Sequence, residues 1–247
     1  MTRVKICGLR DPETAVAATK AGADFVGLVF AQSPRQVTRQ ECYDIITAIR
    51  ETRRDSTPAL IEQPKRDEIN EASWFGAWND AIDNALARWR PLIVGVFAEQ
   101  ATTDINEIAE VASLELVQLS GGEPTELVRS IHRPVLQAIH VHKDTIADDV
   151  FDKAFPGVAA GVLLDTGSTG AHGGSGKPFN WRVAAEVGER LPLMLAGGLS
   201  TANVGDAIAV VDPWAVDVSS GVETKGKKDI EKVRAFIREA KGANVGH

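Results

Sequence analysis

The chain has few cysteines, fewer basic than acidic residues, and no long hydrophobic run. Its two cysteines, Cys7 and Cys42, form neither a CxxC pair nor a disulfide framework, so we expect a reducing, cytoplasmic environment. A net charge of −7 argues against a nucleic-acid-binding surface. No apolar run approaches the roughly 20 residues that cross a bilayer. The start, Met-Thr-Arg-Val, has no charged n-region followed by an apolar h-region, so we expect neither a signal peptide nor a membrane partner.

Short strand-like runs alternate with helical patterns along almost all of the 247 residues, which predicts βα units around a parallel sheet. The expected strands span residues 3–7, 24–30, 91–97, 116–119, 135–139, 161–164, 193–195 and 215–218. Eight strand–helix units predict a single (β/α)8 TIM-barrel domain over 1–247. A doubly wound sheet is the alternative, but it usually has fewer strands and a GxGxxG sequence after the first, which is absent here.

The first two helices carry clear boundary signals. Asp11 followed by Pro12 predicts an N-cap with proline at the first helical position, and Gly22 predicts the end of that helix. Thr38 and Glu41 match a capping box that opens the second helix. Later helices are expected to begin near residues 103, 124, 145, 179, 201 and 228.

The regular alternation breaks at about residues 52–90. This polar, proline-bearing stretch gives way to partly helical spacing, so we predict a loop and one or two helices inserted after the second helix. Trp74, Trp78 and Trp89 lie in this insertion. They could form a partner surface, but we favour aromatic side chains that hold the added helix against the barrel wall.

Two ionisable side chains end apolar strands, Cys7 after residues 3–6 and Asp165 after 162–164. The carboxyl ends of barrel strands converge on the mouth where the chemistry of this fold takes place, so the pair suggests a base and an acid. A lone cysteine is more often a small buried hydrophobe, and an aspartate there could instead be solvated. A cation such as Lys5 or Arg35 could lower the pKa of the thiol. We expect Lys5, however, to face the other side of the barrel wall.

The loops after the seventh and eighth strands predict a phosphate site. The first has a glycine pair before a helix, and the second has hydroxyl groups and a glycine. Barrel enzymes frequently hold phosphate with these two loops, although tight glycine turns are the alternative. The candidate residues are Gly197, Gly198, Asp217, Ser219, Ser220 and Gly221.

Two further loops suggest ligand contacts. Arg35 follows Ser33-Pro34 after the second strand and offers a fork suited to a carboxylate, although a surface arginine is commoner. The glycine-dense run 167–176 after Asp165 is typical of a lid that excludes water. It contains His172, which is a candidate catalytic residue, although a histidine in a loop is more often exposed to solvent. The other histidines lack metal-ligand spacing, so we expect no metal site.

Six segments together resemble phosphoribosylanthranilate isomerases of tryptophan biosynthesis, collinearly from residue 3 to about 240 except for the insertion. They read Lys-Ile-Cys-Gly at 5–8, Ser-Pro-Arg at 33–35, Leu-Asp-Thr at 164–166, Gly-Gly-Ser-Gly at 173–176, Leu-Ala-Gly-Gly-Leu at 195–199 and Asp-Val-Ser-Ser-Gly-Val-Glu at 217–223. Each is modestly specific, but six in order form a specific pattern.

The resemblance implies an Amadori rearrangement of N-(5-phosphoribosyl)anthranilate. Asp165 would be the general acid that opens the ring, and Cys7 the general base that removes the C2 proton. Arg35 would hold the anthranilate carboxylate, and the loops at 197–198 and 219–221 would hold the phosphate. Gly174 would also contact the substrate. Asp217 could contact a sugar hydroxyl or structure its loop. No cofactor is implied. The oligomeric state could be monomer or homodimer, and other enzymes of tryptophan synthesis are candidate partners.

One departure concerns the fourth strand, where the family typically has Gln-Leu-His-Gly and this chain has Ser120 in place of the histidine. Because that histidine is not one of the acid–base pair, the change affects loop contacts or substrate fit rather than the reaction class. Rival functions include the indole-forming synthase, which should show lysines at several strand ends. A related isomerase of histidine biosynthesis uses two aspartates, the first replaced here by Cys7. A non-catalytic phosphate-binding barrel is the last rival.

Overall fold

A computed structural model describes residues 1–54, 59, 61–64, 71–165 and 181–243 of the chain. Eight parallel strands close into a barrel in chain order, and the first pairs with the eighth to complete the ring. The (β/α)8 prediction is therefore confirmed, and each strand lies within one residue of its predicted bounds. The strands are β1 Arg3–Cys7, β2 Phe25–Val29, β3 Leu92–Phe97, β4 Leu116–Leu119, β5 Val135–His140, β6 Gly161–Asp165, β7 Leu193–Ala196 and β8 Ala215–Val218.

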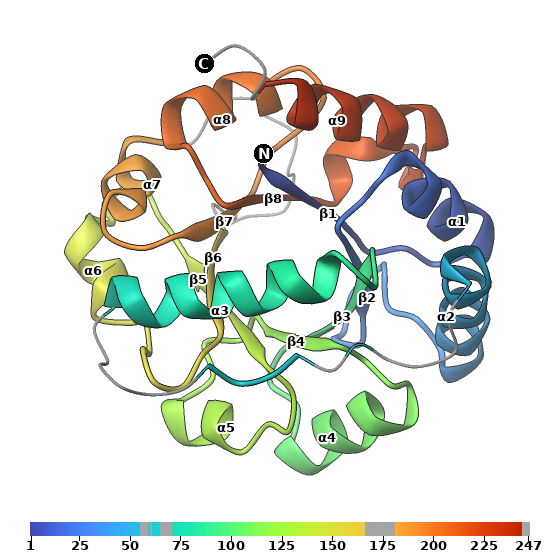
Figure 1. Ribbon diagram of the computed structural model, residues 1–247, viewed down its shortest axis with the longest axis horizontal. Coiled ribbons are helices and arrows are strands. Elements are labelled where there is room, and N and C mark those ends of the chain that lie inside the picture. Colours follow the sequence, from blue (N-terminus) through green and yellow to red (C-terminus); the bar gives the residue numbers. More distant parts are fainter. Residues whose placement is uncertain (55–58, 60, 65–70, 166–180, 244–247) are drawn as a thin grey trace.

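Helices surround the barrel, and Figure 1 shows them as a ring viewed down the barrel axis. They begin within three residues of their predicted starts. The ring is formed by α1 Pro12–Ala21, α2 Arg39–Arg53, α4 Thr102–Val111, α5 Thr125–Arg129, α6 Ala147–Phe151, α7 Trp181–Gly188, α8 Val204–Val211 and α9 Ile230–Gly242.

The predicted helix boundaries of α1 and α2 are present in the structure. The Asp11 carboxylate accepts a hydrogen bond from the Thr14 amide at 2.8 Å, and Gly22 ends α1 with a φ of 91°. The capping box at α2 is complete, because the Thr38 hydroxyl accepts from the Glu41 amide and the Glu41 carboxylate accepts from the Thr38 amide. These local signals suffice because capping satisfies backbone groups that the helix itself leaves unpaired.

Helix α3, Glu71–Leu86, lies across the amino-terminal end of the barrel (Figure 1). Trp74 and Trp78 are buried, and the Trp74 indole donates to the Ala159 carbonyl, just before β6. Ile82 packs among side chains from the starts of the strands, such as Phe25 and Leu92. Trp74 and Trp78 thus take part in the packing between α3 and the rest of the protein.

The side chains of each strand divide into two sets. One set packs with the ring helices, as Val4 and Ile6 of β1 do. The other packs with the corresponding side chains of the other strands and with α3, as Leu136 and Leu163 do. Since successive strand residues point to opposite faces, the second set fills the barrel interior, and its next members along each strand reach the carboxyl-terminal mouth. Strand parity therefore identifies which side chains face the mouth.

Replacing Ile82 with alanine should destabilise the protein, because the side chain is fully buried where α3 covers the barrel. Loss of the contacts and the resulting cavity predict a cost of about 2–5 kcal/mol in the free energy of unfolding. Urea denaturation would measure it. Ile146→Ala is the matched control, since Ile146 is 58% exposed. Equal stability of the two variants would contradict the assignment of α3 as part of the core.

Candidate active site

The carboxyl-terminal mouth gathers the ionisable side chains that strand parity turns inward. Cys7 follows the outward-packed Ile6, and Asp217 follows the outward-packed Val216. Asp165 lies two residues beyond the inward-packed Leu163. The structure thus places Cys7 of β1, Asp165 of β6 and Asp217 of β8 on the inner face of one barrel end.

Lys5 forms a buried ion pair with Asp217, with 3.0 Å between Nζ and Oδ2. Lys5 is fully buried, and its ammonium also interacts with Cys7. The expectation that Lys5 faces away from Cys7 is therefore wrong. Side chains two residues apart in a strand lie on the same face, so Lys5 and Cys7 both point into the barrel.

The Cys7 thiol is buried and tightly packed, and Val29 and Val96 are its buried apolar neighbours. A side chain at Gly27 would place its Cβ only 2.8 Å from the Cys7 sulfur, so glycine at this position leaves the room that the thiol needs. Burial raises the pKa of Cys7, and the nearby Asp217 acts in the same direction, whereas Lys5 and Lys228 lower it. Burial dominates, so the pKa of Cys7 lies above its usual range. The expected cation is present, but it does not bring the thiol below that range.

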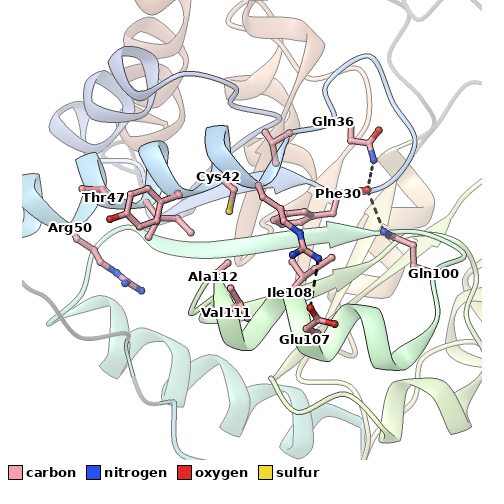
Figure 2. Close-up of a pocket in the computed structure, with 14 residues that line it drawn as sticks. Phe30, Gln36, Cys42, Thr47, Arg50, Gln100, Glu107, Ile108, Val111 and Ala112 are labelled. Atoms are coloured by element: carbon pink, nitrogen blue, oxygen red, sulfur yellow. Dashed lines mark hydrogen bonds and ion pairs between the residues drawn. The ribbon is translucent and has the colours of Figure 1, made fainter.

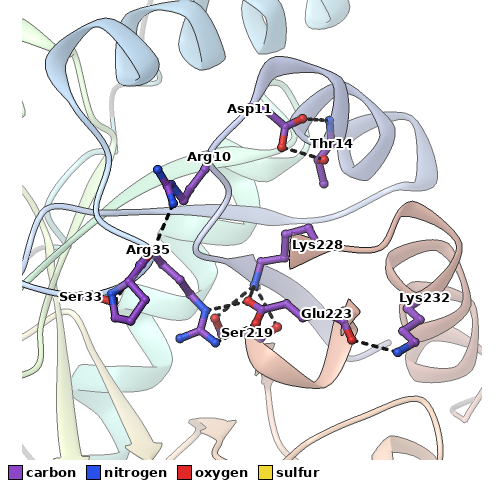
Figure 3. Close-up of polar contacts among 10 residues, drawn as sticks. Arg10, Asp11, Thr14, Ser33, Arg35, Ser219, Glu223, Lys228 and Lys232 are labelled. Atoms are coloured by element: carbon purple, nitrogen blue, oxygen red, sulfur yellow. Dashed lines mark hydrogen bonds and ion pairs between the residues drawn. The ribbon is translucent and has the colours of Figure 1, made fainter. Parts of the chain in front are cut away.

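Arg35 makes a two-pronged ion pair with Glu223 at the rim of the mouth (Figure 3). Its Nε and Nη2 donate to the two carboxylate oxygens at 2.6 and 2.8 Å. The arginine passes over Gly8, where a Cβ would lie 2.7 Å from Arg35 Cδ, and Gly8 has a φ of 75°. Because Gly8 directly follows Cys7, Arg35 lies beside the candidate base.

The loops after β7 and β8 are in close contact. A Cβ at Gly221 would lie 1.9 Å from the Leu199 carbonyl oxygen, so only glycine lets the loops approach this closely. Gly197 and Gly198 have φ angles of 88° and 64°, which favour glycine. Ser219 is half-buried and Ser220 is exposed. The structure therefore brings the candidate phosphate loops together.

Asp165 ends β6 opposite His140 of β5 in the strand register, and its carbonyl accepts from the Val141 amide at 2.9 Å. Residues 166–180, which follow Asp165, lie outside the described residues. Gly174 and His172 belong to this range, so their predicted roles remain predictions.

Sequence reasoning gave no role to His140 and Gln118, which strand parity also turns toward the mouth. The His140 ring nitrogen Nε2 lies 2.8 Å from the Ser120 carbonyl oxygen, and Gln118 donates to the Ser120 hydroxyl at 3.0 Å. The side-chain oxygen of Gln118 is buried without a hydrogen-bond partner in the described structure, and so is Asp217 Oδ1. Leu136 and Leu116 face the barrel interior. Every second residue after them, toward the carboxyl end of each strand, also faces inward, and this count identifies His140 and Gln118.

A separate groove of about 360 Å³ lies between α2 and α4 on the outer wall of the barrel (Figure 2). Phe30, Cys42 and Ile108 are among its lining residues, and an ion pair between Arg39 and Glu107 spans its rim at 3.6 Å. None of the mouth residues described above lines it. We therefore assign the chemistry to the mouth and not to this groove.

A closed barrel with ionisable side chains gathered at the carboxyl ends of its strands defines the class of (β/α)8-barrel enzymes. A family model for N-(5'-phosphoribosyl)anthranilate (PRA) isomerase matches residues 59–239. The chain belongs to this family.

Individual relatives support the same assignment. An N-(5'-phosphoribosyl)anthranilate isomerase of Dehalococcoides mccartyi is 35% identical over 99% of this chain and 98% of its own length. A multifunctional tryptophan biosynthesis protein of Phycomyces blakesleeanus is 38% identical over 98% of this chain, which spans only 33% of that longer protein.

Solved structures show the same fold. The phosphoribosyl anthranilate isomerase of Thermotoga maritima is 33% identical and superposes with a TM-score of 0.72, covering 98% of this chain and 100% of that one. A solved phosphoribosyl anthranilate isomerase in complex with reduced 1-(o-carboxyphenylamino)-1-deoxyribulose 5-phosphate is 32% identical, with a TM-score of 0.69, and covers 98% of this chain and 100% of that one.

Replacing Lys5 with methionine should raise the pKa of Cys7 further, because it removes a charge that favours the thiolate. Thiolate absorbance at 240 nm would measure the change as the pH is raised. Cys42 should be alanine in all variants, since burial raises its pKa to about 11 and its signal would overlap.

Because Lys5→Met leaves Asp217 buried without its partner, a second comparison adds Asp217→Asn. The double variant should titrate at higher pH than Asp217→Asn alone. A midpoint that stays the same or falls when Lys5 is removed would contradict the role of this ammonium.

Proposed function

We propose that the mouth of the barrel converts N-(5-phosphoribosyl)anthranilate into 1-(2-carboxyphenylamino)-1-deoxyribulose 5-phosphate by general acid–base catalysis. The observation that carries this proposal is the placement of Cys7 and Asp165 on the inner face of one barrel end. Their strands, β1 and β6, are separated by β7 and β8 around the ring. A substrate bound across the mouth would therefore meet an acid from one side and a base from the other.

The first step is ring opening. Asp165 donates a proton to the ring oxygen of the sugar, and the C1–oxygen bond breaks as the anilino nitrogen forms a Schiff base with C1. The positive charge of that Schiff base makes the C2 proton acidic. Cys7, as thiolate, then takes this proton, and the electrons of the C–H bond form an enolamine that tautomerises to the ketose. Oxidation at C2 balances reduction at C1, so the reaction requires no external electron acceptor.

Binding follows from the charges around the mouth. The Arg35 side chain is 30% exposed, and its guanidinium suits the anthranilate carboxylate because a planar group with paired N–H donors can bind two oxygens. Main-chain amides near Gly198 and Ser220 suit the phosphate, since glycine-rich loops and helix starts bind anions. Asp217 Oδ1 suits a sugar hydroxyl, because its other oxygen already pairs with Lys5.

The same proposal concerns setting and partners. The protein acts in the cytoplasm, where both buried cysteines would remain as free thiols. Among the described residues, no helix is long and apolar enough to span a membrane. The protein acts as a monomer or homodimer, and other enzymes of tryptophan synthesis are its candidate partners. Support comes from the multifunctional Phycomyces relative and from a solved Thermotoga maritima isomerase that is described as dimeric.

Cys7→Ala and Asp165→Asn should each reduce turnover by at least about 10²-fold, since a positioned acid or base contributes about 10²–10⁴-fold. The assay follows the loss of substrate fluorescence, with the substrate generated in situ from anthranilate. Both variants should still bind the reduced product, because neither side chain is required for the carboxylate or phosphate contacts.

Cys42→Ala is the matched control for the thiol, because Cys42 is buried on α2 away from the mouth. It should retain full turnover. Normal activity in Cys7→Ala would show that another residue is the general base. Normal activity in Asp165→Asn would show that another residue is the general acid.

A further inference from the structure

Arg35, the proposed carboxylate-binding residue, and the candidate phosphate loop at Ser219 are joined through one acidic side chain. Glu223 accepts both hydrogen bonds from Arg35, and it also accepts one from Lys228 at 2.8 Å. Lys228 donates in turn to the Ser219 carbonyl at 2.9 Å and to its hydroxyl at 3.2 Å. Figure 3 shows the four side chains in one continuous cluster.

A short hairpin presents this cluster. Strands β9, Glu223–Thr224, and β10, Lys227–Lys228, run antiparallel, and Glu223 lies opposite Lys228 in their register. Oppositely charged side chains at such positions attract each other across the two strands. The side chains of Glu223 and Lys228 are only 8% and 4% exposed, so water competes little for either one.

The carboxylate of Glu223 is ionised over the physiological pH range. Burial opposes ionisation of Glu223, but the hydrogen bonds and charges of Arg35 and Lys228 outweigh it and lower its pKa to about 2. The carboxylate therefore stays charged far below neutral pH and holds both cations.

The ion pair with Glu223 leaves some N–H donors of the Arg35 guanidinium available for a ligand. A guanidinium has five N–H donors, and Glu223 takes one from Nε and one from Nη2. One donor on Nη1 and the second donor on Nη2 form the end of the guanidinium, which Glu223 does not contact. A second carboxylate can approach that end without displacing Glu223, so the contact with Glu223 orients Arg35 and does not occupy its whole binding edge.

We propose that Glu223 and Lys228 are positioning residues that fix the Arg35 guanidinium relative to the loop at Ser219. The inference rests on the proposed function, in which Arg35 binds the ring carboxylate and this loop binds the phosphate. The two anionic ends of the substrate are then held at a set separation, which places the sugar carbons between Cys7 and Asp165. Neither residue touches the reacting atoms.

The test is Glu223→Gln, which keeps the size of the side chain but removes its charge. We would measure the affinity of the protein for two ligands. The first is the reduced product, reduced 1-(o-carboxyphenylamino)-1-deoxyribulose 5-phosphate, and the second is an analogue of it that lacks the ring carboxylate. Misplacement of Arg35 should weaken binding of the carboxylate-bearing ligand by about 10–100-fold. Affinity for the analogue without a carboxylate should not change, because that ligand makes no contact that depends on the Arg35 guanidinium.

A competing role for Glu223 gives the opposite result. If Glu223 only occupied Arg35 until substrate arrived, Glu223→Gln would bind the carboxylate-bearing ligand more tightly. An equal loss for both ligands would indicate general damage to the fold. Either result overturns the proposal.

Control variants separate positioning from loss of structure. Glu231→Gln removes an exposed ion pair with Arg234 on α9 and should leave both affinities unchanged. Lys228→Arg should retain affinity for the carboxylate-bearing ligand, whereas Lys228→Met should lose it. If Glu223→Gln does not fold, Glu223→Asp keeps the charge and should show a smaller loss confined to the same ligand.

Failure of this inference is distinguishable from failure of the proposed function. Wild-type protein that binds the reduced product but does not convert the substrate would overturn the function. The comparison of the two ligands would still decide the role of Glu223.

Discussion

The ion pair between Lys5 and Asp217 joins the first and last strands inside the barrel, where the two residues are partners in the strand register. Lys5 is fully buried, and a buried charge without its partner is strongly unfavourable. Strand register and charge pairing therefore favour the same closure of the sheet. Because Lys5 shares a face with Cys7, the pair that closes the barrel also sets the electrostatic surroundings of the thiol.

The polypeptide segment that follows Asp217 connects that ion pair to the polar cluster at the rim. Asp217 begins the segment that carries Ser219 and Glu223, and Glu223 reaches back to Arg35 on the loop after β2. Lys228 stands between Ser219 and Glu223 and also influences the thiol. Segments from both ends of the sequence thus meet at one rim. This convergence depends on closure, since β1 pairs with β8 only in a closed ring, and β2 follows β1 in that ring.

The sequence predicted what depends on local or periodic signals. Strand runs, the caps at Asp11 and Thr38, and the strand-end position of Cys7 follow from neighbouring residues alone. The placement of α3 across the amino-terminal end could not be predicted in this way, because it depends on burial against many strands. The pairing of Arg35 with Glu223 spans 188 positions, and no local pattern encodes it. The inward orientation of Lys5 was predictable, because Lys5 and Cys7 are two residues apart in one strand and therefore lie on the same face. The expectation placed them on opposite faces and was wrong.

The raised pKa of Cys7 constrains the order of the proposed steps. A buried neutral thiol is a poor base, and the anionic groups of the substrate would disfavour its thiolate further. The Schiff base formed on ring opening carries a positive charge on the atoms next to C2. A cation that develops beside the sulfur favours the thiolate, in the same sense as the Lys5 ammonium does. In this mechanism the acid must therefore act before the base, because only the product of the first step supplies the charge that the second step requires.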